Sequence, residues 1–195
     1  MFCFVEILLV LYSGFRRGET LGLEWKDCDY DNNVISIRRT SNYTPEKGIY
    51  TDTTKTKRSQ RSIKLPQFVM DLLKQYQAEQ NIEKERLGNK WEDHDRLFTQ
   101  WNGNPMNPHT AGYWLRDFCN ENNFRFCDTH SFRHLNASIL INAGIDVTSV
   151  SANLGHAHTS TTLNIYSHYF SEYQARTSEV IVNAINFKHT AKSKT

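Results

Sequence analysis

The residues that suggest chemistry most directly are two arginines, each with a polar neighbour three positions away. Arg16 precedes Glu19, and His130 precedes Arg133. Side chains three apart lie side by side on a helix, so Glu19 would hold the first guanidinium while it points into a cleft. Guanidiniums held in this way are suited to bind phosphate oxygens. For the first pair alone, the alternative is an exposed ion pair at a helix end, which contributes little.

Two further segments carry reactive side chains. Lys55 lies in a basic turn, Lys-Thr-Lys-Arg-Ser-Gln-Arg, which on its own is typical of a charged loop. His156 follows Leu-Gly, and Tyr166 comes ten residues later. Taken alone, Tyr166 is one aromatic residue among several on a helix, where core packing is the simpler interpretation.

Charge is concentrated in one stretch of the chain. Between positions 38 and 64 there are eight lysines and arginines against two carboxylates, although the formal charge of the whole chain is only +2. A stretch of this kind is either a solvated face or a surface that binds phosphates. The overall charge is too small to identify a partner by itself.

Metal chemistry is a weaker alternative. His130 and His134 have the spacing of a zinc-binding helix, and His156 and His158 would complete a hydrolase site. However, Ser131 stands where that helix pattern needs a glutamate. The four cysteines form no CxxC pair, so they indicate neither a zinc ribbon nor a disulfide framework. We expect no metal and no other cofactor.

Length and composition indicate one globular domain. With 195 residues, 38% of them hydrophobic and 23% charged, the chain is neither a disordered tail, a fibre nor a membrane-embedded protein. Its longest apolar stretch, Phe2 to Tyr12, contains Glu6 and is far shorter than the roughly 20 residues that cross a bilayer. The stretch lacks the features of a secretory signal, so we expect a cytoplasmic protein.

A mainly helical domain is needed to position these side chains. Hydrophobic spacing predicts a buried helix over 2–13, a short helix near 17–23, and a helix that begins after Pro66. A small antiparallel sheet is predicted from extended segments near 34–37, 49–54 and 61–65. Further helices are expected at about 109–122, 129–143, 146–154, 159–170 and 172–187. The predicted fold class is α+β, mainly helical.

Taken together and in this order, the segments resemble the catalytic domain of the tyrosine recombinases, the integrase family of phages and conjugative transposons. The shared pattern is arginine-x-Gly-Glu after a buried helix, a lysine in a sheet turn, His-x-x-Arg, Leu-Gly-His and a tyrosine ten residues later. The resemblance extends from about residue 2 to residue 185. The departures are mild, since Ser131 and Phe132 replace a common Asp-Leu and Ser13 replaces a common threonine.

The resemblance implies a role for each of these residues. Tyr166 would be the nucleophile, and Glu19 would support the first catalytic arginine. Lys55, which precedes a threonine, matches the lysine that protonates the leaving 5′ oxygen, with Lys57 as an alternative. The implied catalytic residues are Arg16, Lys55, His130, Arg133, His156 and Tyr166. The residues expected to track DNA phosphates are Arg38, Arg39, Lys57, Arg58 and Arg61.

The implied function is site-specific recombination of a mobile element, by integration or excision. DNA strands would be cut and rejoined through a 3′-phosphotyrosine, with no metal. The implied partners are double-stranded DNA and further copies of the protein, as a tetrameric synapse in the full-length parent, at the nucleoid. The alternative is a catalytically inactive relative that still binds DNA.

The expected domain organisation is a catalytic domain over 1–187 and a basic flexible tail over 188–195. The N-terminal core-binding and arm-binding domains of the family do not fit into this length. Without them, we expect weak, salt-sensitive binding to duplex DNA. The helix at 172–187 has an apolar stripe that would dock on a neighbouring protomer or on its own chain.

Overall fold

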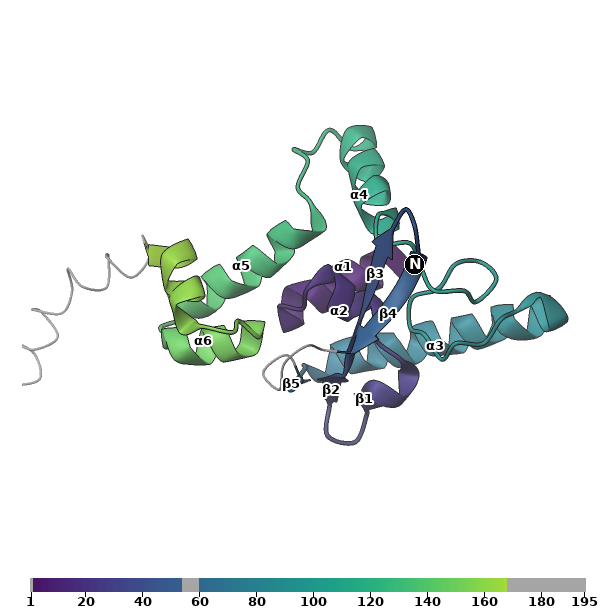
Figure 1. Cartoon of the computed structure of the whole chain (residues 1–195), viewed down its shortest axis with the longest axis horizontal. Helices are drawn as coiled ribbons and strands as arrows, with labels where there is room; N and C mark the ends of the chain where they lie inside the picture. Colours follow the sequence, from purple (N-terminus) through teal and green to yellow (C-terminus); the bar gives the residue numbers. More distant parts are fainter. Residues whose placement is uncertain (1, 54–59, 168–195) are drawn as a thin grey trace, which may run out of the picture.

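Helix α1 (Phe2–Ser13) runs through the middle of the molecule (Figure 1). The computed structural model describes residues 2–53 and 60–167. The helix is apolar on most sides, and Val5, Leu9 and Val10 are among its buried side chains. It is followed by Gly14, whose φ of +69° is a conformation that favours glycine. The predicted boundaries of this helix are confirmed.

The other helices lie close to their predicted positions. They are α2 (Arg17–Leu21), α3 (Gln67–Leu87), α4 (Thr110–Glu121), α5 (Thr129–Asn142) and α6 (Val147–Leu154), with short 3-10 turns η1 (Trp25–Asp27) and η2 (Gly88–Lys90). Residues 159–167 are also helical. Asp128 and Asp146 cap α5 and α6, because each carboxylate accepts backbone N–H bonds of the first turn. The predicted helix 172–187 and the tail 188–195 lie outside the described residues.

The strands of the described part form two antiparallel sheets, whereas the sequence predicts one. In the first, β2 (Val34–Ile37) pairs with β1 (Cys28–Asp29) and β5 (Arg61–Lys64). The second is a ribbon of β3 (Arg39–Thr44) and β4 (Gly48–Thr53), with Arg39 opposite Thr53. The sequence does not predict β3, because this strand is polar and buries only Ser41. The predicted class, mainly helical α+β, is confirmed.

Two hydrophobic clusters make up the interior. The larger joins α1, the first sheet and α3, and it includes Phe15, Ile35 and Leu73. The smaller joins α5, α6 and the helix at 159–167; its buried members are Ala137, Ile141, Val150, Leu154 and Tyr166. Helix α1 packs directly against α5. Polar side chains of the candidate site help to link the two clusters.

A network of buried charges joins the C-terminal end of α2 to the β3–β4 ribbon. Asp27 Oδ2 lies 2.5 Å from Arg39 Nη1, which is also 3.1 Å from Glu24 Oε2. Arg96 donates to a backbone carbonyl at the end of α2 and, at 2.6 Å, to the hydroxyl of Thr51 in β4. Two carboxylates therefore stand against two buried arginines in this network.

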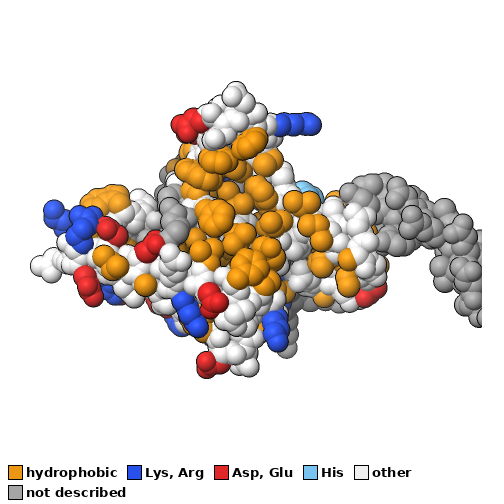
Figure 2. All heavy atoms as spheres, turned by 180° about the vertical axis from the view of Figure 1, so that it is seen from behind, with side chains coloured by type: hydrophobic (Ala, Val, Ile, Leu, Met, Phe, Trp, Pro, Cys, Tyr) orange, Lys and Arg blue, Asp and Glu red, His pale blue; other side chains and the backbone are white. Residues whose placement is uncertain are grey.

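Large hydrophobic side chains gather on the face opposite that of Figure 1, where they extend from α4 down to the centre (Figure 2). The exposed large side chains on α1, α4 and α5 are Phe4, Tyr12, Tyr113, Trp114, Phe118, Leu135 and Ile139. A continuous patch of this kind is typical of an interaction surface. None of the described helices is both long enough and apolar enough to span a membrane.

Candidate active site

Arg16 stands immediately before α2, where the backbone is extended. Its backbone N–H donates to Glu19 Oε2 at 2.9 Å, and its Nη1 donates to Glu19 Oε1 at 2.8 Å. Its Nη2 donates to the carbonyl oxygen of Gly155 at 2.9 Å, which ties α2 to the end of α6. The carboxylate three residues later thus holds Arg16. Because the Arg16 side chain is still 39% exposed, a ligand can reach it.

Glu19 is buried and is shared by a second arginine. Arg61, on β5, donates to its two carboxylate oxygens at 3.1 and 2.9 Å. Burial alone would raise the pKa of Glu19, but the hydrogen bonds and charges of Arg61 and Arg16 outweigh it and hold the pKa below its usual value. Glu19 is therefore ionised at neutral pH and fixes both guanidiniums.

Arg133 is the most deeply buried arginine of the site, with 3% of its surface exposed. It lies in α5 and donates to the carbonyl oxygen of Gly14, to that of Leu154 at 2.8 Å, and to His156 Nε2 at 3.0 Å. Burial, followed by the nearby charge of Arg16, lowers its pKa to about 9. The group remains charged at neutral pH, and it connects α1, α5 and α6.

His156 lies between Arg133 and the helix at 159–167. Its Nδ1 is 2.8 Å from the hydroxyl of Thr162. An arginine N–H can only donate, so Nε2 accepts from Arg133, and we assign the ring proton to Nδ1, which donates to Thr162. Burial and the charges of Arg133 and Arg16 lower the pKa of His156 to about 4. The imidazole is therefore neutral at physiological pH.

His130 is exposed at the start of α5, next to a second histidine. The rings of His130 and His134 meet edge to face with their centroids 4.7 Å apart. Partial burial, with the charges of His134 and Arg133, lowers the pKa of His130 below its usual value. One turn of α5 therefore brings both histidines and Arg133 to the same place.

Tyr166 is 4% exposed and packs in the smaller hydrophobic cluster. Its hydroxyl lies 2.7 Å from Nδ1 of His134. Its charge also affects the pKa of Arg133, so the phenol and the guanidinium lie within electrostatic range of each other. Sequence reasoning considered His134 only as a zinc ligand and missed this contact. The sequence feature that could have indicated this contact is the pair of histidines, one helical turn apart, on either side of Arg133.

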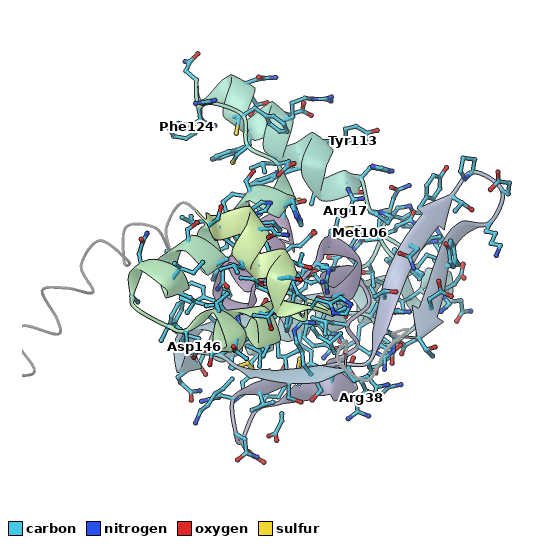
Figure 3. The ribbon with its side chains drawn as sticks, turned by 60° about the vertical axis from the view of Figure 1, so that its left-hand side comes forward. Arg17, Arg38, Met106, Tyr113, Phe124 and Asp146 are labelled. Carbon is cyan, nitrogen blue, oxygen red and sulfur yellow. The ribbon has the colours of Figure 1, made fainter. Side chains whose placement is uncertain are left out.

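The basic stretch divides into exposed and buried arginines. Arg38 is 62% exposed and points away from the sheet (Figure 3), with a long contact of 3.4 Å to Asp27. In contrast, Arg39 is paired with Asp27, and Arg61 is 9% exposed and paired with Glu19. Both buried guanidiniums are thus engaged within the protein, although the sequence places them on a DNA-tracking surface. The other expected residues of this surface, and the lysine of the sheet turn, lie outside the described residues: Lys55, Lys57 and Arg58.

The histidines of the zinc alternative make other contacts. His134 bonds the Tyr166 hydroxyl, and His156 bonds Arg133 and Thr162. Within residues 2–53 and 60–167, no group of three or more His, Cys, Asp or Glu side chains is placed to hold a metal ion. The described geometry therefore gives this alternative no support.

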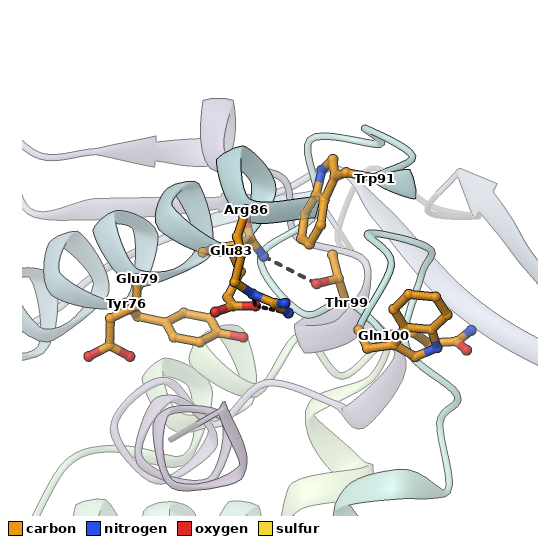
Figure 4. A pocket seen from close by; sticks show the side chains of 9 residues that line it. Tyr76, Glu79, Glu83, Arg86, Trp91, Thr99 and Gln100 are labelled. Atoms are coloured by element: carbon orange, nitrogen blue, oxygen red, sulfur yellow. Dashed lines mark hydrogen bonds and ion pairs between the residues drawn. The ribbon is translucent and has the colours of Figure 1, made fainter. Parts of the chain in front are cut away.

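A separate pocket lies between the C-terminal half of α3 and the segment 91–101 (Figure 4). Tyr76 and Trp91 line it, and Glu83 pairs with Arg86 at its edge. The side-chain amide of Gln80 donates a hydrogen bond of 3.3 Å to the hydroxyl of Thr99. None of the candidate site residues lines this pocket. A second pocket is next to the site and is lined by Arg61, Thr148, Ser151, Ala152, Gly155, His156 and Thr159.

The charge balance of the site indicates its ligand. In the described part of the chain, the guanidiniums of Arg16, Arg61 and Arg133 are grouped around one carboxylate, that of Glu19. The three guanidiniums and the single carboxylate therefore carry a net charge of +2, and Arg133 forms no ion pair with a carboxylate among the described residues. Planar guanidiniums bind phosphate and similar anions through paired hydrogen bonds, so the arrangement can hold an anion beside a tyrosine hydroxyl.

Several characterised proteins are similar in sequence. The chain is 28% identical over 162 residues to the ICEBs1 integrase of Bacillus subtilis, covering 83% of this chain and 44% of that protein. It is 30% identical over 159 residues to the integrase of Staphylococcus phage L54a, covering 80% and 45%. A XerC-like tyrosine recombinase of Caldanaerobacter subterraneus is 29% identical, with 89% and 47% covered. The chain thus spans less than half the length of these relatives.

Solved structures share the fold. The Tn1549 transposon integrase in complex with circular intermediate DNA has a TM-score of 0.74 at 24% identity, with 91% of this chain and 59% of that chain covered. The catalytic domain of the bacteriophage HP1 integrase has a TM-score of 0.53 at 14% identity, with 98% and 84% covered. The likeness to the second structure extends over almost the whole of this chain.

The family follows from a match along most of the sequence. The model of the phage integrase family matches residues 3–172, which include every candidate catalytic residue and both buried arginine networks. The resemblance drawn from the spaced arginines, histidines and tyrosine is therefore confirmed. The chain belongs to the phage integrase family and has the tyrosine recombinase catalytic fold.

Proposed function

We propose that this chain is the catalytic unit of a recombinase that integrates or excises a mobile element. It cuts and rejoins DNA through a 3′-phosphotyrosine and without a metal. The observation that carries the proposal is a cluster of guanidiniums beside a tyrosine: Arg16 and Arg61 share Glu19, Arg133 bonds His156, and the Tyr166 hydroxyl contacts His134, the residue next to Arg133. This surplus of positive charge matches a transition state that gains negative charge on phosphate oxygens.

Each side chain has a separate task in this reaction. Arg16 and Arg133 bind the non-bridging oxygens of the scissile phosphate, while Glu19 holds Arg16 in place. Tyr166 attacks phosphorus, and Lys55 gives a proton to the departing 5′ oxygen. Because the phosphotyrosine conserves the bond energy, rejoining needs no nucleotide.

The histidines assist at the phosphate. His156 is neutral and its Nε2 accepts from Arg133, so it orients this guanidinium before DNA binds. His130 is exposed at the start of α5, where a phosphate oxygen can approach it. In this proposal His130 and His156 both contact the phosphate once it is bound.

Double-stranded DNA is the proposed substrate, bound in the cytoplasm at the nucleoid. Relatives are described in complex with DNA, among them the XerH site-specific recombinase bound to its difH substrate, at 25% identity and a TM-score of 0.61. Arg38 and the segment with Lys57 and Arg58 track phosphates, so we expect weak binding that falls steeply with salt. Sub-nanomolar, sequence-specific binding by this chain alone would contradict that expectation.

We further propose that residues 1–187 form the catalytic domain, with a basic tail over 188–195, and that copies associate on DNA. The exposed hydrophobic patch on α1, α4 and α5 supports self-association. Sedimentation with and without duplex tests it. Dimers or tetramers on the duplex are expected, and a strictly monomeric complex at every ratio of protein to DNA would reject it.

The test of the reaction is covalent trapping on a nicked suicide duplex in EDTA, followed by a denaturing gel and peptide mapping. The wild type is expected to form an adduct at Tyr166, and Tyr166→Phe is expected to form none. The duplex carries the site of the parent element. Under those conditions, DNA binding without an adduct would support an inactive relative instead.

A further inference from the structure

The hydroxyl of Tyr166 is placed against one particular ring nitrogen. His134 Nδ1 lies 2.7 Å from the Tyr166 oxygen, which is the distance of a strong hydrogen bond. The two rings are tilted at 59° with their centroids 5.9 Å apart, so the contact is edge to edge rather than stacked. Both residues are held by their helices, His134 in α5 and Tyr166 in the helix at 159–167.

Two other groups that could take a proton, His156 and Glu19, are engaged elsewhere. His156 uses Nε2 to accept from Arg133 and Nδ1 to bond Thr162. The Glu19 oxygens accept from Arg16 and Arg61. In the part of the chain that the structure describes, His134 brings an imidazole nitrogen into contact with the phenol.

The surroundings of His134 suit proton transfer to it during attack. The groups that face it are the ring of His130 and the phenol of Tyr166, and Arg133 precedes it in α5. A bound phosphate places negative charge beside these groups, and the charge on its oxygens grows in the transition state, which favours transfer of the proton to the His134 ring.

We propose that His134 is the general base that activates Tyr166, an inference that rests on the proposed function. As the bond from Tyr166 oxygen to phosphorus forms, the phenolic O–H bond breaks and the proton moves to His134 Nδ1. The bond from phosphorus to the 5′ oxygen breaks at the same time, and that oxygen takes a proton from Lys55. Rejoining reverses both transfers, so His134 returns its proton to Tyr166.

The kinetic test compares His134→Ala with His134→Asn. The Asn oxygen replaces Nδ1 as a hydrogen-bond acceptor but does not take a proton, so it separates positioning from base catalysis. Both variants are expected to form the adduct on a suicide duplex about 10²–10⁴-fold more slowly than the wild type. Their rates should rise with pH, and imidazole should partly rescue His134→Ala. Near wild-type rates for His134→Asn would overturn the proposal and leave a positioning role.

Duplex binding and the thermal unfolding midpoint are measured for both variants, so that a folding defect is not read as a chemical one. If the variants unfold, the proton itself is followed in the wild type with ¹⁵N-labelled histidine by NMR. We expect an unprotonated Nδ1 on His134 at neutral pH, with a signal that shifts in Tyr166→Phe. A protonated Nδ1 that donates to the phenol overturns the base role, whether or not the wild type forms an adduct. Failure of the wild type to form any adduct is a separate result, against the proposed function.

Discussion

Two buried networks of arginines and carboxylates lie at opposite ends of α2, and they differ in charge balance. At the C-terminal end, Asp27 and Glu24 stand against the two largely buried arginines Arg39 and Arg96. Lys26 and Arg38 also pair with these carboxylates, but both side chains are mostly in solvent. At the N-terminal end, one carboxylate, Glu19, stands among three arginines in the described part of the chain; these are Arg16, Arg61 and Arg133.

The difference separates a structural network from a binding site. Buried charges are costly unless they are paired, so a balanced network is complete as it stands. A network with surplus positive charge gains when an anion enters. Arginine content alone therefore does not distinguish the two ends of α2, whereas the ratio of guanidiniums to carboxylates does.

The largest expected effect comes from removing the carboxylate of the unbalanced network. Glu19→Gln leaves three arginines without a counter-charge and should lower the free energy of unfolding by about 3–5 kcal/mol, as when one partner of a buried ion pair is lost. Added sulfate should restore part of this loss, because the anion replaces the missing charge. The restoration is measured by comparing thermal unfolding of the variant in sulfate with its unfolding in chloride at the same ionic strength.

The matched variant for that experiment is Asp27→Asn in the balanced network. This substitution should also destabilise the chain, but sulfate should raise its unfolding temperature no more than it raises that of the wild type. The comparison with the wild type corrects for the general stabilising effect of sulfate. Equal restoration of both variants would show that the two networks do not differ in anion binding.

Replacing an arginine with lysine in each network sharpens the comparison. Arg133→Lys keeps the charge but loses the paired hydrogen bonds of the guanidinium. Covalent cleavage of a suicide duplex should slow by about 10²–10³-fold, the usual cost of losing one donor to a developing oxyanion. Arg96→Lys should alter stability while folded molecules cleave at the wild-type rate. A similar loss of rate in both variants would contradict the division.

Glu6 in α1 extends the comparison to a buried carboxylate without an arginine partner. It is 1% exposed, and neither carboxylate oxygen has a hydrogen-bond partner among the described residues. Burial raises its pKa to about 7, against an opposing effect of Arg17. The folded chain therefore holds a proton that the unfolded chain loses at lower pH, so this contribution to stability is lost as pH rises through the folded pKa.

Between pH 5 and pH 8, the unfolding free energy of Glu6→Gln should gain about 3 kcal/mol relative to the wild type, since one pKa unit corresponds to about 1.4 kcal/mol. Denaturant titrations at the two pH values measure the gain. A difference between variant and wild type that stays constant with pH would mean that Glu6 is ionised in the fold.

The smallest effect is expected at the exposed end of the basic stretch. Arg38→Ala should weaken duplex binding several-fold and lower the slope of log affinity against log salt by about 1, as for one lost phosphate contact. Its stability should change by less than about 0.5 kcal/mol, as is usual for surface substitutions. Arg39→Ala should show the opposite pattern, with a lower free energy of unfolding and little change in the salt slope of duplex binding. An unchanged salt slope for Arg38→Ala would remove it from the DNA surface.

Features governed by neighbours in sequence could be predicted well. Helix α1 matches its predicted range because its apolar residues and the following glycine define both of its ends. Helices α5 and α6 begin at capping aspartates, which can be recognised in the sequence. Strand β3 could not be predicted, because its residues are polar and pair with β4 through the backbone rather than through an apolar face.

The sequence predicts a set of site residues, and the structure brings the described ones together, but the sequence does not predict how they pair. Glu19 and Arg16 are three residues apart, so their contact follows from helix geometry. Arg61 is 42 residues from Glu19, and His134 is 32 residues from Tyr166. Charge and residue type do not specify partners over such distances, because the tertiary fold determines them. For that reason the sequence predicts a place on the DNA surface for Arg61 and predicts no contact between His134 and Tyr166.

The order in which the chain is made has a consequence for the hydrogen bonds between the two hydrophobic clusters. These bonds join residues more than a hundred positions apart, as in Arg133 to Gly14, separated by 119, and Arg16 to Gly155, separated by 139. Contacts across such long loops form late in folding, because the chain must first lose the entropy of closing them. During synthesis, a partly made chain holds Arg16 and Glu19 long before Tyr166 has left the ribosome. The candidate site is therefore assembled only after the segment that contains Tyr166 has been made.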